Sequence, residues 1–254
     1  MEHLVQHAVS TIRERFGEPL SLDELARSAM VSKYHFLRMF TRVTGVTPGR
    51  FLSAVRLQEA KRLLLSTSLN VADVSVQVGY NSAGSFTRRF TESVGLSPTQ
   101  YRKLSLSARD ETLEPGSPEP VAAAPLPAPQ SLPTGSVTGV LRTAGSVLSP
   151  IHVGVFDSPI LQGAPVSWSN ASEAGDFTLA RIPTGTWYIH AVAQGSHPDN
   201  TADPGPTRLM ATVGPVPVKG DTAHRLDITL SPLDWTKPPI LSALMDIGAQ
   251  PIAA

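Results

Sequence analysis

The sequence of 254 residues predicts a multidomain chain, in which an all-α N-terminal domain and an all-β sandwich are joined by a linker rich in proline and alanine. Three observations support this division. Residues 32–51 recur as residues 82–101, which indicates one supersecondary unit built twice. Residues 109–134 are dominated by Pro, Ala, Ser and Glu, a composition typical of linkers. After Gly135 the hydrophobic period changes from 3.6 residues to 2, as expected where strands replace helices.

Each copy of the repeat is predicted to contain a short helix, a tight turn and a second helix. The expected short helices are residues 22–29 and 71–78, and the expected second helices are residues 32–44 and 82–94. Polar side chains suited to cap the helix N-termini are Ser21, with Glu24 in a capping box, Ser32, Asn70 and Ser82. The glycines suited to end the second helices are Gly45 and Gly95.

The second helix of each copy is predicted to bury an apolar stripe and to expose an arginine. The stripe of the first copy comprises Phe36, Met39, Phe40 and Val43. Arg38 lies on the opposite face, and Arg88 takes the same position in the second copy. This pattern is typical of helix-turn-helix units. Ordinary helical hairpins with solvated arginines are the alternative, which the repetition of the outward arginine disfavours.

The charge is distributed unevenly along the chain. Residues 1–104 contain 14 Lys and Arg against 8 Asp and Glu, whereas residues 105–254 contain 7 against 13. The formal net charge of zero therefore hides a basic half and an acidic half. A basic helical domain gains affinity for nucleic acid because its cations displace counterions from phosphates. The charge thus favours double-stranded DNA as the partner of the first half.

Residues 3 to about 104 resemble the DNA-binding domain of the AraC/XylS transcriptional regulators of bacteria. The resemblance covers about two-fifths of the chain. The motifs that carry it are PLSLDELA at 19–26, VSKYHFLRMF at 31–40, GYNS at 79–82, FTRRF at 86–90 and GLSPTQYR at 95–102. It implies two helix-turn-helix units at the ends of a connecting helix, expected at residues 48–65, which enter successive major grooves. It also implies transcription regulation, with activators among the family, and RNA polymerase as a partner.

The same resemblance, carried over position by position, implies two sets of DNA-binding residues. The base-reading candidates are Tyr34, Leu37, Arg38, Ala83, Gly84, Thr87 and Arg88. The candidates for phosphate contact are Lys33, Thr41, Arg42, Ser82, Ser85 and Arg89. Leu37 has no polar group, so any sequence information it carries is contact with a thymine methyl. Many family members have polar residues where this chain has Ala83 and Gly84, so direct readout by the second unit rests mainly on Arg88 and Thr87.

The C-terminal half is predicted to form an antiparallel β-sandwich at residues 135–232, followed by an irregular tail at 233–254 with a short helix at 239–247. The expected strands include 151–156, 177–179, 187–192 and 226–230. Residues 139–141, 175–179 and 182–188 are similar to the carboxypeptidase regulatory-like, or transthyretin-like, sandwich. We expect this domain to bind an effector or a partner protein. The proline-rich linker predicts that residues 1–108 fold and bind DNA without it.

No catalytic, metal or cofactor site is expected. The chain contains no cysteine, so thiolate metal sites and disulfides are excluded. Iron dioxygenases with a related sandwich use two tyrosines, whereas Tyr188 is the only tyrosine after Tyr101. The four histidines of this half show no metal-ligand spacing and are assigned structural or surface roles; they are His152, His190, His197 and His224. The lack of a signal-peptide pattern or a spanning segment predicts a cytoplasmic protein, associated with the nucleoid when bound.

The sequence therefore predicts a sequence-specific transcriptional regulator with a C-terminal sensing or interaction domain. An architectural DNA-binding protein is one alternative, although such proteins usually have a stronger basic excess and apolar wedges. A β-sandwich enzyme with a regulatory DNA-binding head is the other. Most relatives of this kind carry the sensor before the DNA-binding domain, so the order expected here is reversed. The operator, the effector and the direction of regulation do not follow from the sequence.

Overall fold

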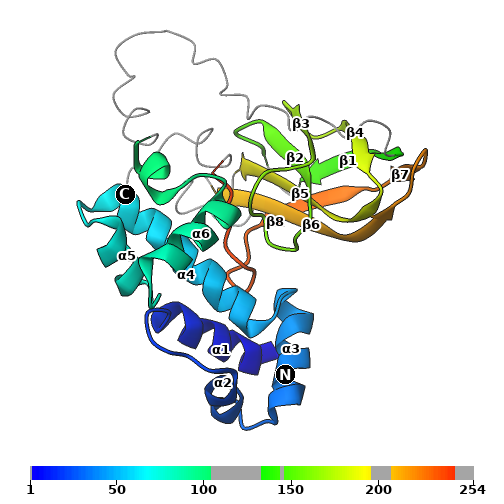
Figure 1. The fold of residues 1–254 in the computed structure, drawn as a ribbon. Coiled ribbons are helices and arrows are strands. Elements are labelled where there is room, and N and C mark those ends of the chain that lie inside the picture. Colours follow the sequence, from blue (N-terminus) through cyan, green and yellow to red (C-terminus); the bar gives the residue numbers. More distant parts are fainter. Residues whose placement is uncertain (1, 104–132, 144–145, 196–206, 244–254) are drawn as a thin grey trace. The chain divides into compact units, whose positions relative to one another are not determined.

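A computed structural model describes residues 2–103, 133–143, 146–195 and 207–243 (Figure 1). All but the last two residues of the expected linker lie outside these ranges. The chain forms two compact units, a helical unit of residues 1–105, 159–164 and 234–254, and a β unit of residues 106–158 and 165–233. No helix within the described residues is both long and apolar enough to cross a membrane.

The helices of the helical unit follow the predicted repeat closely. Their bounds are α1 (Glu2–Glu14), α2 (Leu22–Ser28), α3 (Lys33–Thr44), α4 (Pro48–Ser66), α5 (Val71–Gln77) and α6 (Ala83–Val94). Residues 98–103 are also helical, up to the limit of the described segment. The predicted bounds of α2 to α6 agree with these to within one residue, because capping residues mark the ends in the sequence itself.

Two equivalent aromatic clusters form much of the helical core. In the first copy, the ring centroid of Phe40 lies 5.7 Å from that of Phe36 and 5.6 Å from that of Phe51. In the second copy, Phe90 lies 5.6 Å from Phe86 and 5.8 Å from Tyr101. Such spacings are typical of favourable edge-to-face and tilted ring pairs. Each recognition unit is therefore anchored by the same three aromatic positions.

Two segments from the C-terminal half of the sequence belong to the helical unit. Residues 159–164 and residues 234–243 contribute Ile160, Leu241 and Ala243 to the same buried core as the helices. The sequence pattern predicts the first segment as part of the β-sandwich and the second as part of an irregular tail. The helical unit is thus completed by residues far from it in the sequence, which conflicts with the expectation that residues 1–108 are a self-contained module.

The segment of residues 234–243 is held against the helices by hydrogen bonds, and we call it the C-terminal strap. Arg13 Nη2 donates to the carbonyl of Trp235 at 2.8 Å, and the buried Lys61 Nζ donates to the carbonyl of Leu241 at 3.2 Å. The predicted helix at 239–247 is wrong for residues 239–243, which are not helical. Its backbone N–H groups bond elsewhere, as in the 2.9 Å contact from Leu241 to Leu161.

The β unit contains eight described strands. They are β1 (Thr134–Thr143), β2 (Ile151–Phe156), β3 (Ser167–Ala171), β4 (Asp176–Pro183), β5 (Gly185–Gly195), β6 (Thr207–Val218), β7 (Ala223–Arg225) and β8 (Ile228–Pro232). Strand pairing runs without interruption in the order β3-β2-β5-β6-β8-β1-β4, with β7 also paired to β1 (Figure 1). The inward side chains of these strands form a second core, separate from the helical one.

The expected antiparallel sandwich is not confirmed, because the strands form one nearly closed, barrel-like sheet. The two ends of the strand order approach each other, and Ser167 Oγ on β3 donates to the carbonyl of Ala180 on β4 at 2.8 Å. The sheet is also mixed, since β1 pairs in parallel with both β7 and β8. A period of two residues predicts strands but not which strands pair. The near closure of the sheet therefore could not be predicted from the sequence.

His190 is a buried histidine of the β unit, and both of its ring nitrogens lie within hydrogen-bond distance of protein oxygens. Its side chain is 1% exposed, Nδ1 lies 2.9 Å from Thr212 Oγ1, and Nε2 lies 2.9 Å from the carbonyl oxygen of Ser158. Burial lowers the pKa of His190 to about 4, against the raising effect of the Ser158 carbonyl. His190 is therefore neutral in the folded protein near neutral pH.

This pKa predicts a loss of stability in mild acid. Because the folded pKa lies below the unfolded value of 6.5, the unfolded chain takes up a proton first as the pH falls. The β unit should lose on the order of 3 kcal/mol between pH 6.5 and pH 4. His190→Gln should flatten this dependence, whereas His224→Gln should retain it. Urea unfolding followed by tryptophan emission, in a Trp235→Phe background so that the β-unit tryptophans report, tests the prediction.

Candidate nucleic-acid interface

The recognition helices α3 and α6 begin and end in the same way. The N-cap side chains of Ser32 and Ser82 accept a hydrogen bond from the backbone N–H three residues further on, at 3.3 and 3.2 Å. Gly45 and Gly95 then take the left-handed conformation, with φ of 82° and 91°. Glycine adopts this conformation without the penalty that a Cβ imposes. The caps fix the ends of both helices and so fix which side chains face outward.

The turn before each recognition helix also has one geometry in both copies. Met30 and Gly79 both have positive φ, 54° and 83°. The next residue in each turn, Val31 or Tyr80, donates its backbone N–H to a carbonyl five residues back, at 3.1 and 2.9 Å. This is the hydrogen bond that closes a Schellman ending of a helix. The turns therefore match even though the second is one residue longer, and both helix pairs are helix-turn-helix units.

Gly79→Ala should destabilise the helical unit by about 1–3 kcal/mol, because alanine strains this backbone conformation. A Cβ at Gly79 would also lie 2.8 Å from the carbonyl oxygen of Gly17 and 2.9 Å from Arg56 Nη2. Gly84→Ala is the matched control, since nothing lies within 4 Å of its Cβ position and alanine favours helix. Thermal unfolding monitored by circular dichroism distinguishes the two, and equal effects would contradict this account of the turn.

The outward face of α3 carries the three base-reading candidates of the first copy. Tyr34 is 78% exposed and Arg38 is exposed, whereas Leu37 is half-buried between them and the core. Of the predicted stripe of α3, Phe36, Met39 and Phe40 are buried and Val43 packs against the core; Thr44, which was not predicted, is also buried. Tyr34 and Arg38 are therefore available to a partner, and Leu37 offers only part of its surface.

The outward face of α6 carries smaller side chains than that of α3. Gly84 and Arg88 are exposed, while Ala83 and Thr87 are half-buried. The Arg88 guanidinium lies 3.6 Å from Glu92, an exposed pair one helical turn apart. Exposed pairs of this kind contribute little to stability, so Arg88 loses little by leaving Glu92 for another acceptor.

The candidates for phosphate contact differ in the hydrogen bonds and ion pairs that their side chains already make within the protein. Lys33 Nζ lies 2.9 Å from Asp23, and this hydrogen bond and charge raise the pKa of Lys33. The Ser82 and Ser85 hydroxyl oxygens lie 2.8 Å apart, so both take part in the cap of α6. Thr41 is half-buried, and Arg42 is exposed in the last turn of α3. Within the described residues Arg42 is exposed and makes no ion pair, so it is available for a phosphate contact.

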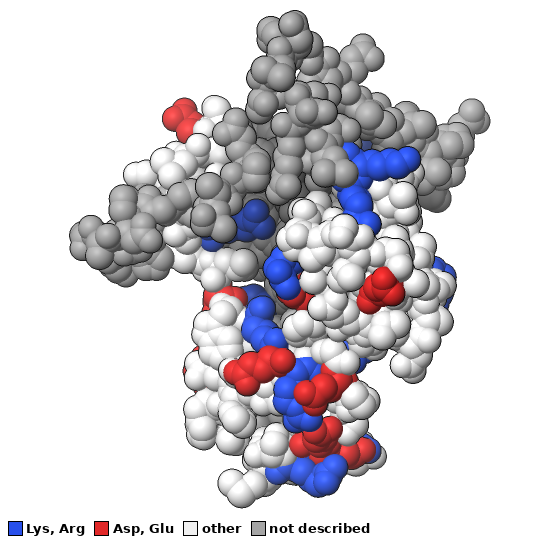
Figure 2. Space-filling view, turned by 90° about the vertical axis from the view of Figure 1, so that its left-hand side faces the viewer, with Lys and Arg blue, Asp and Glu red and all other residues white. Residues whose placement is uncertain are grey.

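Arg89 has a different setting from the other phosphate candidates. It pairs with Glu92 at 3.7 Å and lines a cavity of the helical unit with residues of α4 and the C-terminal strap. Figure 2 shows Lys and Arg side chains interspersed with Asp and Glu over the helices of this unit. The excess of positive charge is thus broken up locally by ion pairs, such as that between Arg15 and Glu24 at 3.2 Å.

Sequence reasoning missed the contacts that hold the C-terminal ends of the recognition helices. Lys237 Nζ donates to the carbonyl of Val43 in α3 at 2.9 Å, and the Ala243 N–H donates to the carbonyl of Val94 in α6 at 2.9 Å. The strap therefore contacts both helix-turn-helix units. The apolar run Ile240-Leu241 in an otherwise irregular tail was the available signal for a buried segment.

The described residues contain no candidate metal site. Within them, no group of three or more His, Cys, Asp or Glu side chains is placed to hold a metal ion. Two of the β-unit histidines besides His190 lie near polar neighbours: His152 Nδ1 is 2.7 Å from Asn170 Oδ1, and His224 Nε2 is 3.3 Å from Thr222 Oγ1. His197 lies outside the described residues.

Residues 25–104, which contain most of both helix-turn-helix units, match the family model of a helix-turn-helix domain. The lactose operon transcription activator of Staphylococcus xylosus is 31% identical over 98 residues, which are 39% of this chain and 35% of that protein. The transcriptional regulator Rob of Salmonella typhimurium is 38% identical over 102 residues, 40% of this chain and 35% of that protein. Residues 25–104 thus carry a helix-turn-helix domain.

Solved structures of similar sequence include the DNA-binding domain of AdpA in complex with a target DNA. It is 28% identical, and the match covers 42% of this chain and 96% of that chain with a TM-score of 0.41. The chain spans about a third of the length of the two curated relatives. The similarity of the C-terminal half to a carboxypeptidase regulatory-like domain is not confirmed.

Proposed function

We propose that this protein is a sequence-specific DNA-binding transcriptional regulator. The observation that carries the proposal is the repetition of one geometry: two recognition helices with the same caps, the same preceding turn and an exposed arginine at the same position. Regulators among the relatives of its helix-turn-helix domain support the same conclusion. The protein acts by binding duplex DNA and has no catalytic step of its own.

In this proposal α3 and α6 enter adjacent major grooves from a single chain. Base edges are read by Tyr34, Leu37, Arg38, Ala83, Gly84, Thr87 and Arg88. Phosphates are held by Lys33, Thr41, Arg42, Ser82, Ser85 and Arg89. Arg38 and Arg88 dominate the readout, because a guanidinium makes two parallel hydrogen bonds to guanine O6 and N7. Thr87 and Leu37 offer limited surface, in keeping with their partial burial.

Substitution of the two arginines tests this assignment. Arg38→Ala or Arg88→Ala should each lose about 1–3 kcal/mol of discrimination, confined to two or three base pairs of its own half-site. Arg42→Ala, the exposed phosphate candidate, should weaken binding to all sequences alike and reduce the salt dependence. Selection of binding sites from a random duplex library, followed by titration at two salt concentrations, measures both quantities. Equal losses on specific and random DNA for all three variants would contradict the assignment.

The same experiment separates the regulator from an architectural DNA-binding protein. An architectural protein binds mainly through phosphates and DNA deformability, so random-library selection would return no shared sequence. We assign effector or partner binding to the β unit, and contact with RNA polymerase to the DNA-bound protein.

A further inference from the structure

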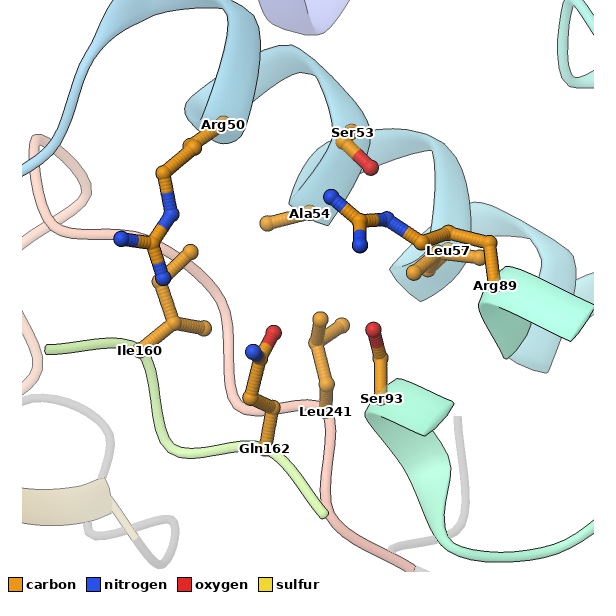
Figure 3. Close-up of a pocket in the computed structure, with 9 residues that line it drawn as sticks. All are labelled: Arg50, Ser53, Ala54, Leu57, Arg89, Ser93, Ile160, Gln162 and Leu241. Carbon is orange, nitrogen blue, oxygen red and sulfur yellow. The ribbon is translucent and has the colours of Figure 1, made fainter. Parts of the chain in front are cut away.

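The helical unit contains a cavity lined by nine residues, of which the DNA-binding proposal uses only Arg89. Its volume is about 350 Å³, within the range of small-molecule sites. The residues that line it are Arg50, Ser53, Ala54 and Leu57 of α4, Arg89 and Ser93 of α6, Ile160 and Gln162, and Leu241 of the strap (Figure 3). Four structural segments that are separated in the sequence thus meet around one small space.

The chemistry of the lining is that of a site for a small anion. Figure 3 shows Arg50 and Arg89 extending toward the same space from opposite sides. Hydroxyl and amide groups of Ser53, Ser93 and Gln162 add neutral hydrogen-bonding groups, and Ala54, Leu57, Ile160 and Leu241 give apolar walls. Guanidinium groups match the geometry of carboxylate and phosphate oxygens and bind them in pairs of parallel hydrogen bonds.

We propose that this cavity binds a small organic anion, with oxygens of carboxylate or phosphate groups held between Arg50 and Arg89. Each arginine has another interaction, which for Arg89 is the 3.7 Å contact with Glu92. A guanidinium has five N–H donors, so it binds a ligand oxygen while keeping such a partner. The apolar walls limit the ligand to a short carbon skeleton.

A free metabolite fits this cavity better than a DNA phosphate does. Ile160, Gln162 and Leu241 lie outside the helix-turn-helix units, and together they form one side of the space in Figure 3. A DNA backbone needs an open basic surface, whereas these residues add an apolar wall and an amide. The bound anion would link α4 to α6 and to the strap. It would therefore help to hold α6, the recognition helix of the second helix-turn-helix unit, against α4.

Calorimetric titration of the full-length chain tests the proposal with three probes: succinate, its uncharged analogue succinamide, and inorganic phosphate. Succinate or phosphate should bind at one site per chain, and succinamide should not. The tighter of the two anions identifies the preferred group, carboxylate or phosphoryl. Arg50→Gln and Arg89→Gln should each weaken binding roughly tenfold or more, because each removes charge-assisted hydrogen bonds.

The matched control is Arg62→Gln, which removes an exposed arginine of α4 that does not line the cavity and should leave binding unchanged. Absence of binding by both anions at millimolar concentration would overturn the proposal, as would binding that Arg50→Gln and Arg89→Gln leave intact. A random-sequence duplex is then titrated against Arg50→Gln, because Arg50 lines the cavity but is not a phosphate candidate. If Arg50→Gln weakens binding of the duplex as much as binding of the anion, Arg50 holds a DNA phosphate and the metabolite site is refuted.

Discussion

Replacing Leu241 by alanine is expected to destabilise the helical unit by about 2–5 kcal/mol, the usual cost of truncating a buried leucine. Leu241 is 1% exposed and belongs to the same core as the helices. Its N–H donates to Leu161 at 2.9 Å, and its carbonyl accepts from the buried Lys61 at 3.2 Å. The truncation therefore leaves a cavity at the point where the strap is held against α4.

Chemical denaturation followed by far-ultraviolet circular dichroism and by Trp235 emission measures this effect, in a chain whose other two tryptophans are replaced by phenylalanine. Trp235 belongs to the strap, so it reports on the helical unit. Leu148→Ala is the matched control, because Leu148 is 59% exposed in the β unit and should cost less than about 0.5 kcal/mol. An unchanged midpoint for Leu241→Ala would mean that residues 1–108 are self-sufficient, as the linker composition had suggested.

The helices were predictable because their signals are local. Ser32 and Ser82, followed by Gly45 and Gly95, mark both ends of each recognition helix within a dozen or so residues, and the aromatic positions repeat at the same interval. Helix ends and buried stripes depend on neighbours three or four residues away, so the sequence alone specifies them. The exposure of Tyr34, Arg38 and Arg88 follows from the same periodicity.

The contributions of distant segments were not predictable in this way. The strap lies after the last strand of the β unit, yet its backbone carbonyls accept hydrogen bonds from Arg13 and Lys61. Nothing local to Lys61 distinguishes it from an exposed lysine, because its partners are main-chain oxygens that any sequence possesses. Likewise, the parallel pairing of β1 with β8 depends on the path of the whole sheet rather than on either strand.

The sequence predicted which residues form the candidate interface. It did not predict the ion pairs and packing contacts that those residues make. The pairing of Lys33 with Asp23 and the place of Arg89 in a cavity change which cations suit phosphate contact. Both depend on side-chain packing between elements. Arg42, which the sequence ranked no higher than the others, makes no ion pair within the described residues and is therefore the most suitable of the three.

Inserting five base pairs between the two half-sites of the operator is expected to abolish specific binding. The connecting helix α4 has 19 residues, which corresponds to about 28 Å at 1.5 Å per residue. Successive major grooves on one face of DNA lie about 34 Å apart, so a recognition unit at each end of α4 spans adjacent grooves with slight bending of the DNA. The unequal faces of α3 and α6 predict a non-palindromic site of roughly 20 base pairs.

Five added base pairs turn the second half-site to the opposite face of the duplex, which α4 cannot follow. Affinity should fall toward that for random DNA, a loss of roughly 10³-fold or more. An insertion of ten base pairs restores the face but not the distance, so the rigid link predicts that it fails as well. Titrations of the full-length protein against the three duplexes, with stoichiometry measured on the parent site, test this directly. Recovery of affinity with the ten-base-pair insertion, or a requirement for two chains on a palindrome, would refute the single-chain, two-groove arrangement.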